Sequence, residues 1–290
     1  MRRPIALCTA MMMMPLLCAG CATVSTTDVT DGASVTENTA QTAGTAAEAP
    51  GGEKPAKKTD PGVDLVHLAA DIESRGDKAT ALTLYERAVS VSNNRSDIRL
   101  ELAQAYERAD RGDEAFKIYR AVLETEPNNG LALVYMGSAL VKKGNLEQGV
   151  ASLSKAAPLL KSPGAYDRLG VAQTLAGRPK EAVVSLQRAH ELAPNDLDVT
   201  TNLALATALA GKRDDAIILM KEVAEQPKAQ PHHRRNFVLV LGLAKKEKEA
   251  LALASADLSK SEIEALLKQA ETIRSVSNPK AQAKALGTIL

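Results

Sequence analysis

The four histidines are the first residues to consider for chemistry. His190 is followed by Glu191, as at the start of a zinc-protease helix motif, but Pro194 occupies the place of the required second histidine. His232 and His233 are adjacent, and no cysteine is available to complete a ligand set. We interpret this pair as a solvent-exposed helix start, and we expect no metal site.

No other group of residues forms a catalytic pattern. The sequence contains no glycine-rich phosphate loop and no Gly-x-Ser-x-Gly nucleophile turn. Acidic pairs such as Asp214 with Asp215 fall in predicted turns, where they are typical helix caps. We therefore expect that the chain is not an enzyme, and that it uses no cofactor and no small-molecule substrate.

The cysteines point to the N-terminus. Cys8, Cys18 and Cys21 all lie within the first 21 residues, so disulfides, zinc–thiolate sites and a thiol nucleophile are excluded from the rest of the chain. Arg2 and Arg3 precede an apolar stretch that ends in small residues. This order is typical of a secretory signal peptide, which we assign to residues 1–20.

The end of this segment, residues 17–21, reads Leu-Cys-Ala-Gly-Cys and resembles a bacterial lipobox, although Cys18 stands where leucine is usual. The resemblance implies cleavage before Cys21 and acylation of that cysteine, which would anchor the chain to a membrane. Ala22 is not the aspartate associated with retention at the inner membrane, so the resemblance favours the outer membrane, facing the periplasm. The alternative is an ordinary secretory signal cut after Ala19 or Gly20, which would leave a free thiol.

Composition predicts the fold class of the remainder. Of the 290 residues only 2% are aromatic and none is Trp, which disfavours an all-β protein, whereas good helix formers dominate. The formal net charge is +1, and two of the basic residues lie in the signal peptide, so nothing indicates nucleic acid as a partner. Residues 21–61 are rich in Thr, Ala and Gly and are predicted to be a disordered tether.

From residue 62 the chain repeats itself about every 34 residues. A small residue marks the register, and a second small position lies twelve residues before each mark. The marks are Ala81, Ala115, Gly149, Ala182, Ala216 and Ala250, and the upstream positions are Ala69, Ala103, Gly137, Gly170, Ala204 and the weaker Val238.

This pattern resembles the tetratricopeptide (TPR) repeat, a helical hairpin of 34 residues. It implies an all-α solenoid of five to six repeats over residues 62–258, with glycine or a substitute such as Asp110 ending each first helix. Such arrays need end caps. Residues 259–290 are predicted to supply capping helices at about 260–274 and 279–288, the first opened by a Ser259–Glu262 capping box.

The TPR resemblance also implies a binding surface, because in these proteins the first helix of each hairpin lines a groove. The N-terminal end of this face carries charged and polar residues without the carboxylate clamp of chaperone-binding repeats, whereas from the third repeat onward it is apolar. The alternative is that part of this column packs inside the array. The candidate groove residues are Leu131, Val134, Val141, Val171, Leu175, Leu205, Leu209, Leu239 and Leu243.

A narrower resemblance concerns residues 236–244 and 249–259, which look like the C-terminal repeat of the tight-adherence (Flp-type) pilus assembly lipoproteins, the TadD family; Lys245 departs from the glycine expected there. This resemblance implies an assembly factor that binds protein components of a pilus or secretion system. The alternative is an outer-membrane adaptor that recruits cell-wall hydrolases or other envelope-assembly proteins. TPR scaffolds serve unrelated functions, so the fold alone does not choose between them.

Overall fold

The computed structural model describes residues 60–255 and 257–287. The predicted signal peptide, Cys21 and nearly all of the predicted tether lie outside the described residues. Within them the chain forms fourteen helices and no strand, apart from an isolated bridge between Ser255 and Leu258. The predicted all-α fold class is therefore confirmed. In the described part of the chain, no helix combines the length and apolar character needed to cross a bilayer.

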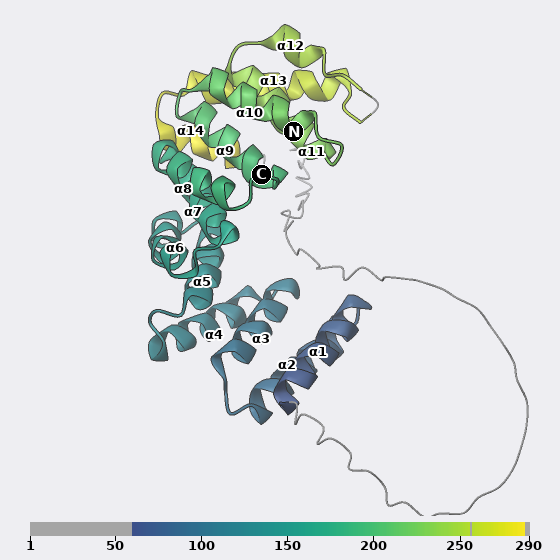
Figure 1. Ribbon diagram of the computed structural model, residues 1–290, viewed down its shortest axis with the longest axis vertical. Helices are drawn as coiled ribbons and strands as arrows, with labels where there is room; N and C mark the ends of the chain where they lie inside the picture. The colour runs from purple at the N-terminus through teal and green to yellow at the C-terminus, as the bar shows by residue number, and fades with distance from the viewer. Residues whose placement is uncertain (1–59, 256, 288–290) are drawn as a thin grey trace, which may run out of the picture. The chain divides into compact units, whose positions relative to one another are not determined.

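Twelve of the helices form six consecutive hairpins. The first helices are α1 (Pro61–Ser74), α3 (Ser96–Arg108), α5 (Gly130–Lys142), α7 (Pro163–Leu175), α9 (Leu197–Leu209) and α11 (Pro231–Leu243). The second helices are α2 (Lys78–Val91), α4 (Gly112–Thr125), α6 (Leu146–Leu160), α8 (Pro179–Leu192), α10 (Arg213–Ala224) and the short α12 (Glu247–Leu251). Each hairpin packs against the next in chain order (Figure 1), which gives a TPR-like solenoid.

The turn inside each hairpin has one recurrent backbone conformation. Gly76, Gly144, Gly177 and Gly211 all have positive φ there, as the repeat pattern predicts. Asp110 and Lys245 occupy the same place in their repeats with φ of 59° and 60°. The unusual lysine therefore leaves the turn geometry of the sixth repeat unchanged.

Small residues allow the two helices of a hairpin to approach closely. A Cβ atom added at Gly137 would lie 2.7 Å from Leu153 Cγ and 3.1 Å from the carbonyl oxygen of Gly149. In the next repeat, a Cβ at Gly170 would lie 2.3 Å from Leu186 Cγ. The repeat register matches Gly170 with Ala182, but the atom closest to a Cβ at Gly170 belongs to Leu186, one turn further along α8.

One large residue in each of the first five hairpins is buried at the same place in the repeat. Tyr85, Tyr119, Leu153, Leu186 and Met220 stand at equivalent places in the second helices of the first five repeats, and each is no more than 2% exposed. Aliphatic side chains from the first helices pack around them. Burial of one such side chain contributes roughly 1.5–3 kcal/mol, and this packing holds the array together.

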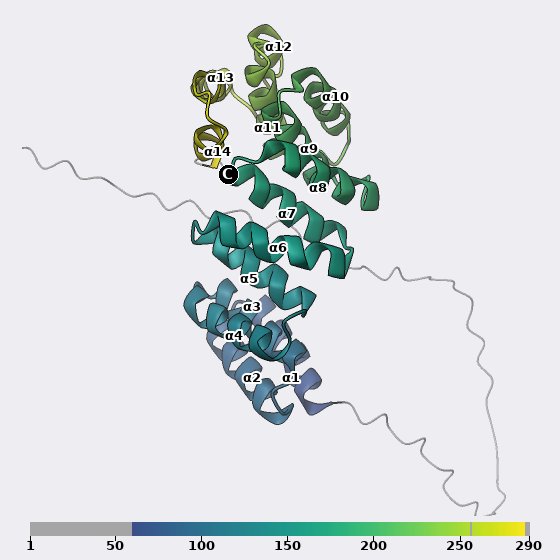
Figure 2. The same cartoon turned by 90° about the vertical axis from the view of Figure 1, so that its left-hand side faces the viewer.

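Two further helices follow the hairpins, α13 (Lys260–Ser275) and α14 (Pro279–Gly287), close to the predicted bounds. The predicted capping box of α13 is confirmed: the Ser259 side chain accepts from the backbone N–H of Glu262, and Glu262 Oε2 accepts from the N–H of Ser259. α13 packs on α11, whereas α14 packs on α13 and reaches back to α7 (Figure 2). The last two described helices therefore fold back along the hairpins.

Candidate partner-binding surface

The structure divides the candidate groove residues into an accessible group and a buried group. Leu131 is 46% exposed, and Val141, Val171, Leu175 and Leu209 are half-buried. The buried group, each 5% exposed or less, comprises Val134, Leu205, Leu239 and Leu243. Only the first group can meet a partner while the chain keeps this arrangement.

The C-terminal helices explain most of the burial. Leu205, Leu239 and Leu243 belong to one apolar cluster with Ile263, Ala270 and Ile273 of α13 and Leu286 of α14. Contact between α11 and α13 is close, because a Cβ at Gly242 would lie 2.6 Å from the Cβ of Ala270. The apolar face of α11 is thus covered by α13 of the same chain.

Val134 is buried for another reason. It lies in a separate cluster with Val150, Leu153, Ala165 and Leu169, which joins the third and fourth hairpins. This residue is part of the packing between repeats, as the alternative interpretation of the column allowed.

Charged pairs connect the first three hairpins on this face. Arg108 donates to both carboxylate oxygens of Glu73, from Nε at 2.7 Å and from Nη2 at 2.8 Å. Hydrogen bonding and charge from Arg108 hold the pKa of Glu73 below its usual value. One repeat later, Lys142 Nζ lies 3.2 Å from Glu107 Oε2. The face is therefore ionic in this part of the array.

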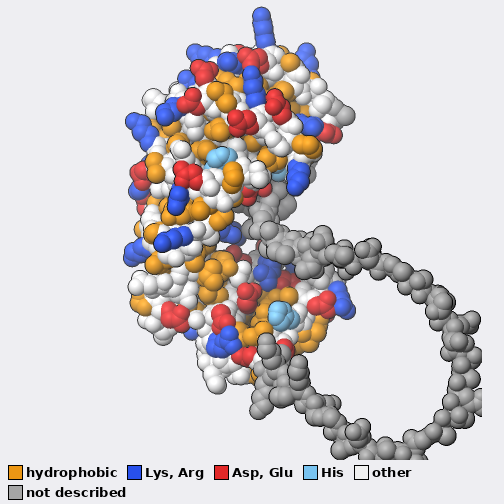
Figure 3. All heavy atoms as spheres, in the orientation of Figure 1, with side chains coloured by type: hydrophobic (Ala, Val, Ile, Leu, Met, Phe, Trp, Pro, Cys, Tyr) orange, Lys and Arg blue, Asp and Glu red, His pale blue; other side chains and the backbone are white. Residues whose placement is uncertain are grey.

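The next equivalent places are apolar, since Val141 and Leu175 stand where Glu107 and Lys142 stand one repeat earlier. Ion pairs between exposed groups contribute little to stability but restrict which partners fit, whereas a half-buried aliphatic pair can bind apolar side chains. On the face seen in Figure 3, basic and acidic side chains are mixed among apolar ones. We call the accessible apolar residues on α5 and α7 the apolar stretch, whereas the ion pairs lie on α1, α3 and the end of α5.

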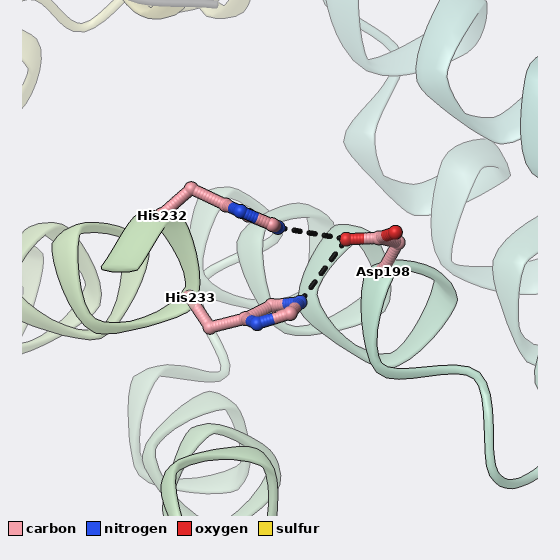
Figure 4. Close-up of side chains that lie close together, drawn as sticks. All are labelled: Asp198, His232 and His233. Atoms are coloured by element: carbon pink, nitrogen blue, oxygen red, sulfur yellow. Dashed lines mark hydrogen bonds and ion pairs between the residues drawn. The ribbon is translucent and has the colours of Figure 1, made fainter. Parts of the chain in front are cut away.

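Sequence reasoning missed a polar cluster at the start of α9 and α11. Asp198 Oδ1 lies 2.8 Å from His232 Nε2 and 3.0 Å from His233 Nε2 (Figure 4). The prediction of a solvent-exposed histidine pair is wrong for His233, which is 3% exposed. Repeat register could have revealed the cluster, because Asp198 and His232 occupy the same place in successive repeats and such places are neighbours in the fold.

The hydrogen bonds of His233 fix its protonation pattern. The backbone N–H of Gln230 donates to His233 Nδ1 at 2.9 Å, so Nδ1 carries a lone pair and the proton of the neutral ring is on Nε2, facing Asp198. Burial first, and then the neighbouring His232, lower the pKa of His233 below its ordinary value of 6.5. The neutral ring therefore joins the start of α11 in the sixth hairpin to the start of α9 in the fifth, and we call this contact the inter-repeat clamp.

The same three side chains are close enough to be considered as metal ligands, because their ligand atoms lie within 4.8 Å of one another. A cation on His233 Nε2 would require the ring proton on Nδ1, where it would meet the N–H of Gln230. Metal-bound histidines usually donate this second N–H to an acceptor. The donor set thus fits an inter-repeat clamp better than a cation site.

Comparison with known proteins agrees with this architecture. The tetratricopeptide repeat family pattern matches residues 96–139, which cover α3, α4 and most of α5. The chain has the fold of a tetratricopeptide-repeat solenoid. No curated protein matches it.

Solved TPR structures share the fold at low sequence identity. A structure from a functional characterization of Pseudomonas aeruginosa pilF has a TM-score of 0.58 and 16% identity, covering 71% of this chain and 97% of that one. YrrB, described as a TPR protein with an unusual peptide-binding site, has a TM-score of 0.53 and 20% identity, covering 65% and 97%. A thermophilic TPR protein of Thermus thermophilus, TTC0263, has a TM-score of 0.51 and 20% identity, covering 62% and 98%.

Proposed function

We propose that this TPR solenoid is a lipid-anchored scaffold of the outer membrane, facing the periplasm, that binds protein components of a Flp-type tight-adherence pilus or a related secretion system. The main support is the apolar stretch on the first-helix face, formed by Leu131, Val141, Val171 and Leu175. Apolar side chains gathered on a surface mark a protein contact. The lipobox-like sequence ending at Cys21 supports the anchor.

The mode of binding follows from the shape of helical repeats. Grooves between helices accept an extended or helical segment that inserts a few apolar side chains. Near the ionic end, the Glu107–Lys142 pair would disfavour a partner that brings apolar groups without polar ones. We therefore expect a short amphipathic segment of the partner to bind from α5 to α7.

The binding test compares a double variant on the apolar stretch with a control substitution outside it. Leu131→Glu combined with Val171→Glu places charges in the apolar stretch, and each charge should cost a few kcal/mol of binding where the contact is desolvated. Val184→Glu is the control, because Val184 is 72% exposed on the second helix α8. Leu205 is unsuitable, since a charge at this buried residue would unfold the array.

The readout is capture of cross-linked partners from cells, with circular dichroism as the folding control. The double variant should lose pilus or secretion components that the control retains, and pilus assembly should fail. A folded double variant that keeps every partner and supports assembly would refute the role of this surface. Loss of cell-wall hydrolases alone would instead favour the adaptor function.

The anchor is tested separately. Cys21→Ser removes the sulfur that would carry the lipid, so the protein should leave the membrane fraction or remain unprocessed. A serine variant that floats with outer membranes as the wild type does would contradict the lipid anchor.

A further inference from the structure

The last described helix, α14, is held to the array by few interactions. It follows a short link, residues 276–278, and contacts α13 and α7. Only Ala283 and Leu286 are deeply buried, each 1% exposed, and their spacing of three places both on one helical face. Lys280 and Lys284 remain exposed. This short amphipathic helix therefore rests on the array by one narrow face.

The start of α14 sits directly on the hairpin turn after α7. A Cβ atom at Gly177 would lie 2.6 Å from the backbone nitrogen of Lys280 and 2.7 Å from its Cα. The turn glycines Gly76, Gly144 and Gly211 have no neighbour within 4 Å of the same position. Lys280 Nζ also lies 3.3 Å from Glu147 Oε1 of α6. Of these four glycine turns, only the Gly177 turn is therefore in direct contact with α14.

The inner face of α14 completes the apolar surface of the later repeats. Leu286 belongs to the same cluster as Leu205, Leu209, Leu239 and Leu243, which are candidate groove residues. The helix thus occupies a place that a helical segment of a partner would take in a groove of this kind.

The neighbouring helix α13 is held far more firmly. It buries Ile263, Ala270 and Ile273 against the array, and Arg274 donates to the carbonyl of Gly242 and pairs with Glu247. By contrast, the Lys280–Glu147 pair that holds α14 is largely exposed, and a helix of nine residues is unstable alone. Release of α14 by itself should therefore be a low-energy local opening.

We propose that α14 is a detachable lid, which covers the apolar surface between α7 and α13 until an amphipathic helix of a partner replaces it. The replacing helix should resemble α14: two small or aliphatic residues three apart, preceded by a lysine that can pair with Glu147. This rests on the proposed function and adds to it a second surface, beside the accessible one, which a partner reaches only when α14 leaves.

The test uses a labelled peptide of residues 277–290 as the probe. A chain ending at residue 276 keeps α13 and should bind the peptide, whereas the full-length chain should bind it at least about tenfold more weakly, because its own α14 competes. A Leu286→Asp peptide is the control and should not bind. No binding to the folded shortened chain, or equal binding of the control peptide, would overturn the proposal.

Two full-length variants test the lid without deleting it. Gly177→Ala and Gly211→Ala introduce the same left-handed strain, but only the first obstructs α14. Gly177→Ala should bind the peptide several-fold more tightly than the wild type, and Gly211→Ala should not. Equal binding by the two variants, or loss of cooperative unfolding in the shortened chain, would show that α14 is structural. These experiments use purified protein, so their failure would leave the proposed role in pilus assembly untouched.

Discussion

The contact between Gly170 and Leu186 offers a sharp test of hairpin packing. Gly170→Ala adds one methyl group, whose carbon would lie 2.3 Å from Leu186 Cγ and 2.9 Å and 3.0 Å from its two methyl carbons. Leu186 is fully buried, so it cannot swing into solvent. Overpacking of this kind costs about 1–3 kcal/mol.

A second effect acts in the opposite direction. Alanine is favoured over glycine inside a helix by about 1 kcal/mol. The net expectation is that Gly170→Ala lowers the free energy of unfolding by about 0–2 kcal/mol, the difference between these effects. Gly164→Ala in the same helix has no atom within 4 Å of the new carbon, so it should be neutral or slightly stabilising.

Urea denaturation followed by circular dichroism measures both variants, and a double-mutant cycle identifies the cause. Leu186→Ala alone should cost about 2–5 kcal/mol, and it also removes the obstacle. Gly170→Ala made in that background should no longer destabilise the protein. If the two substitutions are additive within about 0.5 kcal/mol, or if Gly170→Ala matches Gly164→Ala, the packing argument is refuted.

Two further predictions concern a clamp and a turn. At a pH above 6.5, the ordinary pKa of histidine, His233 is neutral in both the folded and the unfolded chain. At lower pH the unfolded chain binds a proton on this side chain more readily than the folded chain does, because folding lowers the pKa of His233. The free energy of unfolding should therefore fall as the pH drops from about 7.5 to about 5.5. His233→Gln, which keeps an acceptor and a donor, should show a smaller fall in its urea midpoint over that interval, and an equal fall would contradict the assignment. Lys245 has a left-handed backbone conformation with φ of 60°, which glycine adopts without strain, so Lys245→Gly should raise the free energy of unfolding by about 1 kcal/mol. The control Lys246→Gly, at the next residue, should not raise the free energy of unfolding.

Repeat register made most of the architecture predictable. The small residues at Gly137 and Gly170, and the left-handed turn at Asp110, follow from one period because each hairpin repeats the same packing problem. The same register implies that Asp198 and His232 are neighbours, a pair that was not predicted, whereas the buried state of His233 depends on a cap at Gln230 that no period reveals.

The extent of the accessible surface was harder to predict. Leu205, Leu239 and Leu243 have the pattern of groove residues, and nothing in their own repeats distinguishes them from Val171 or Leu175. α11, which carries Leu239 and Leu243, packs against α13, whose sequence has no repeat register. Where such helices fold back is decided by side-chain packing between distant segments, which a local pattern does not encode.

The two ends of the described array are supported unequally, and this has a mechanical consequence. α1 packs mainly on α2 and α3, whereas at the opposite end α13 packs on α11 and α12, and α14 packs on α7 and α13. A pulling force applied to the chain ahead of Asp60 would enter at α1, where Asp60 pairs with Arg95 at the start of the second hairpin. The hairpins would then unfold one after another from α1, and the chain would lengthen under the force while the end packed by α13 and α14 stayed folded.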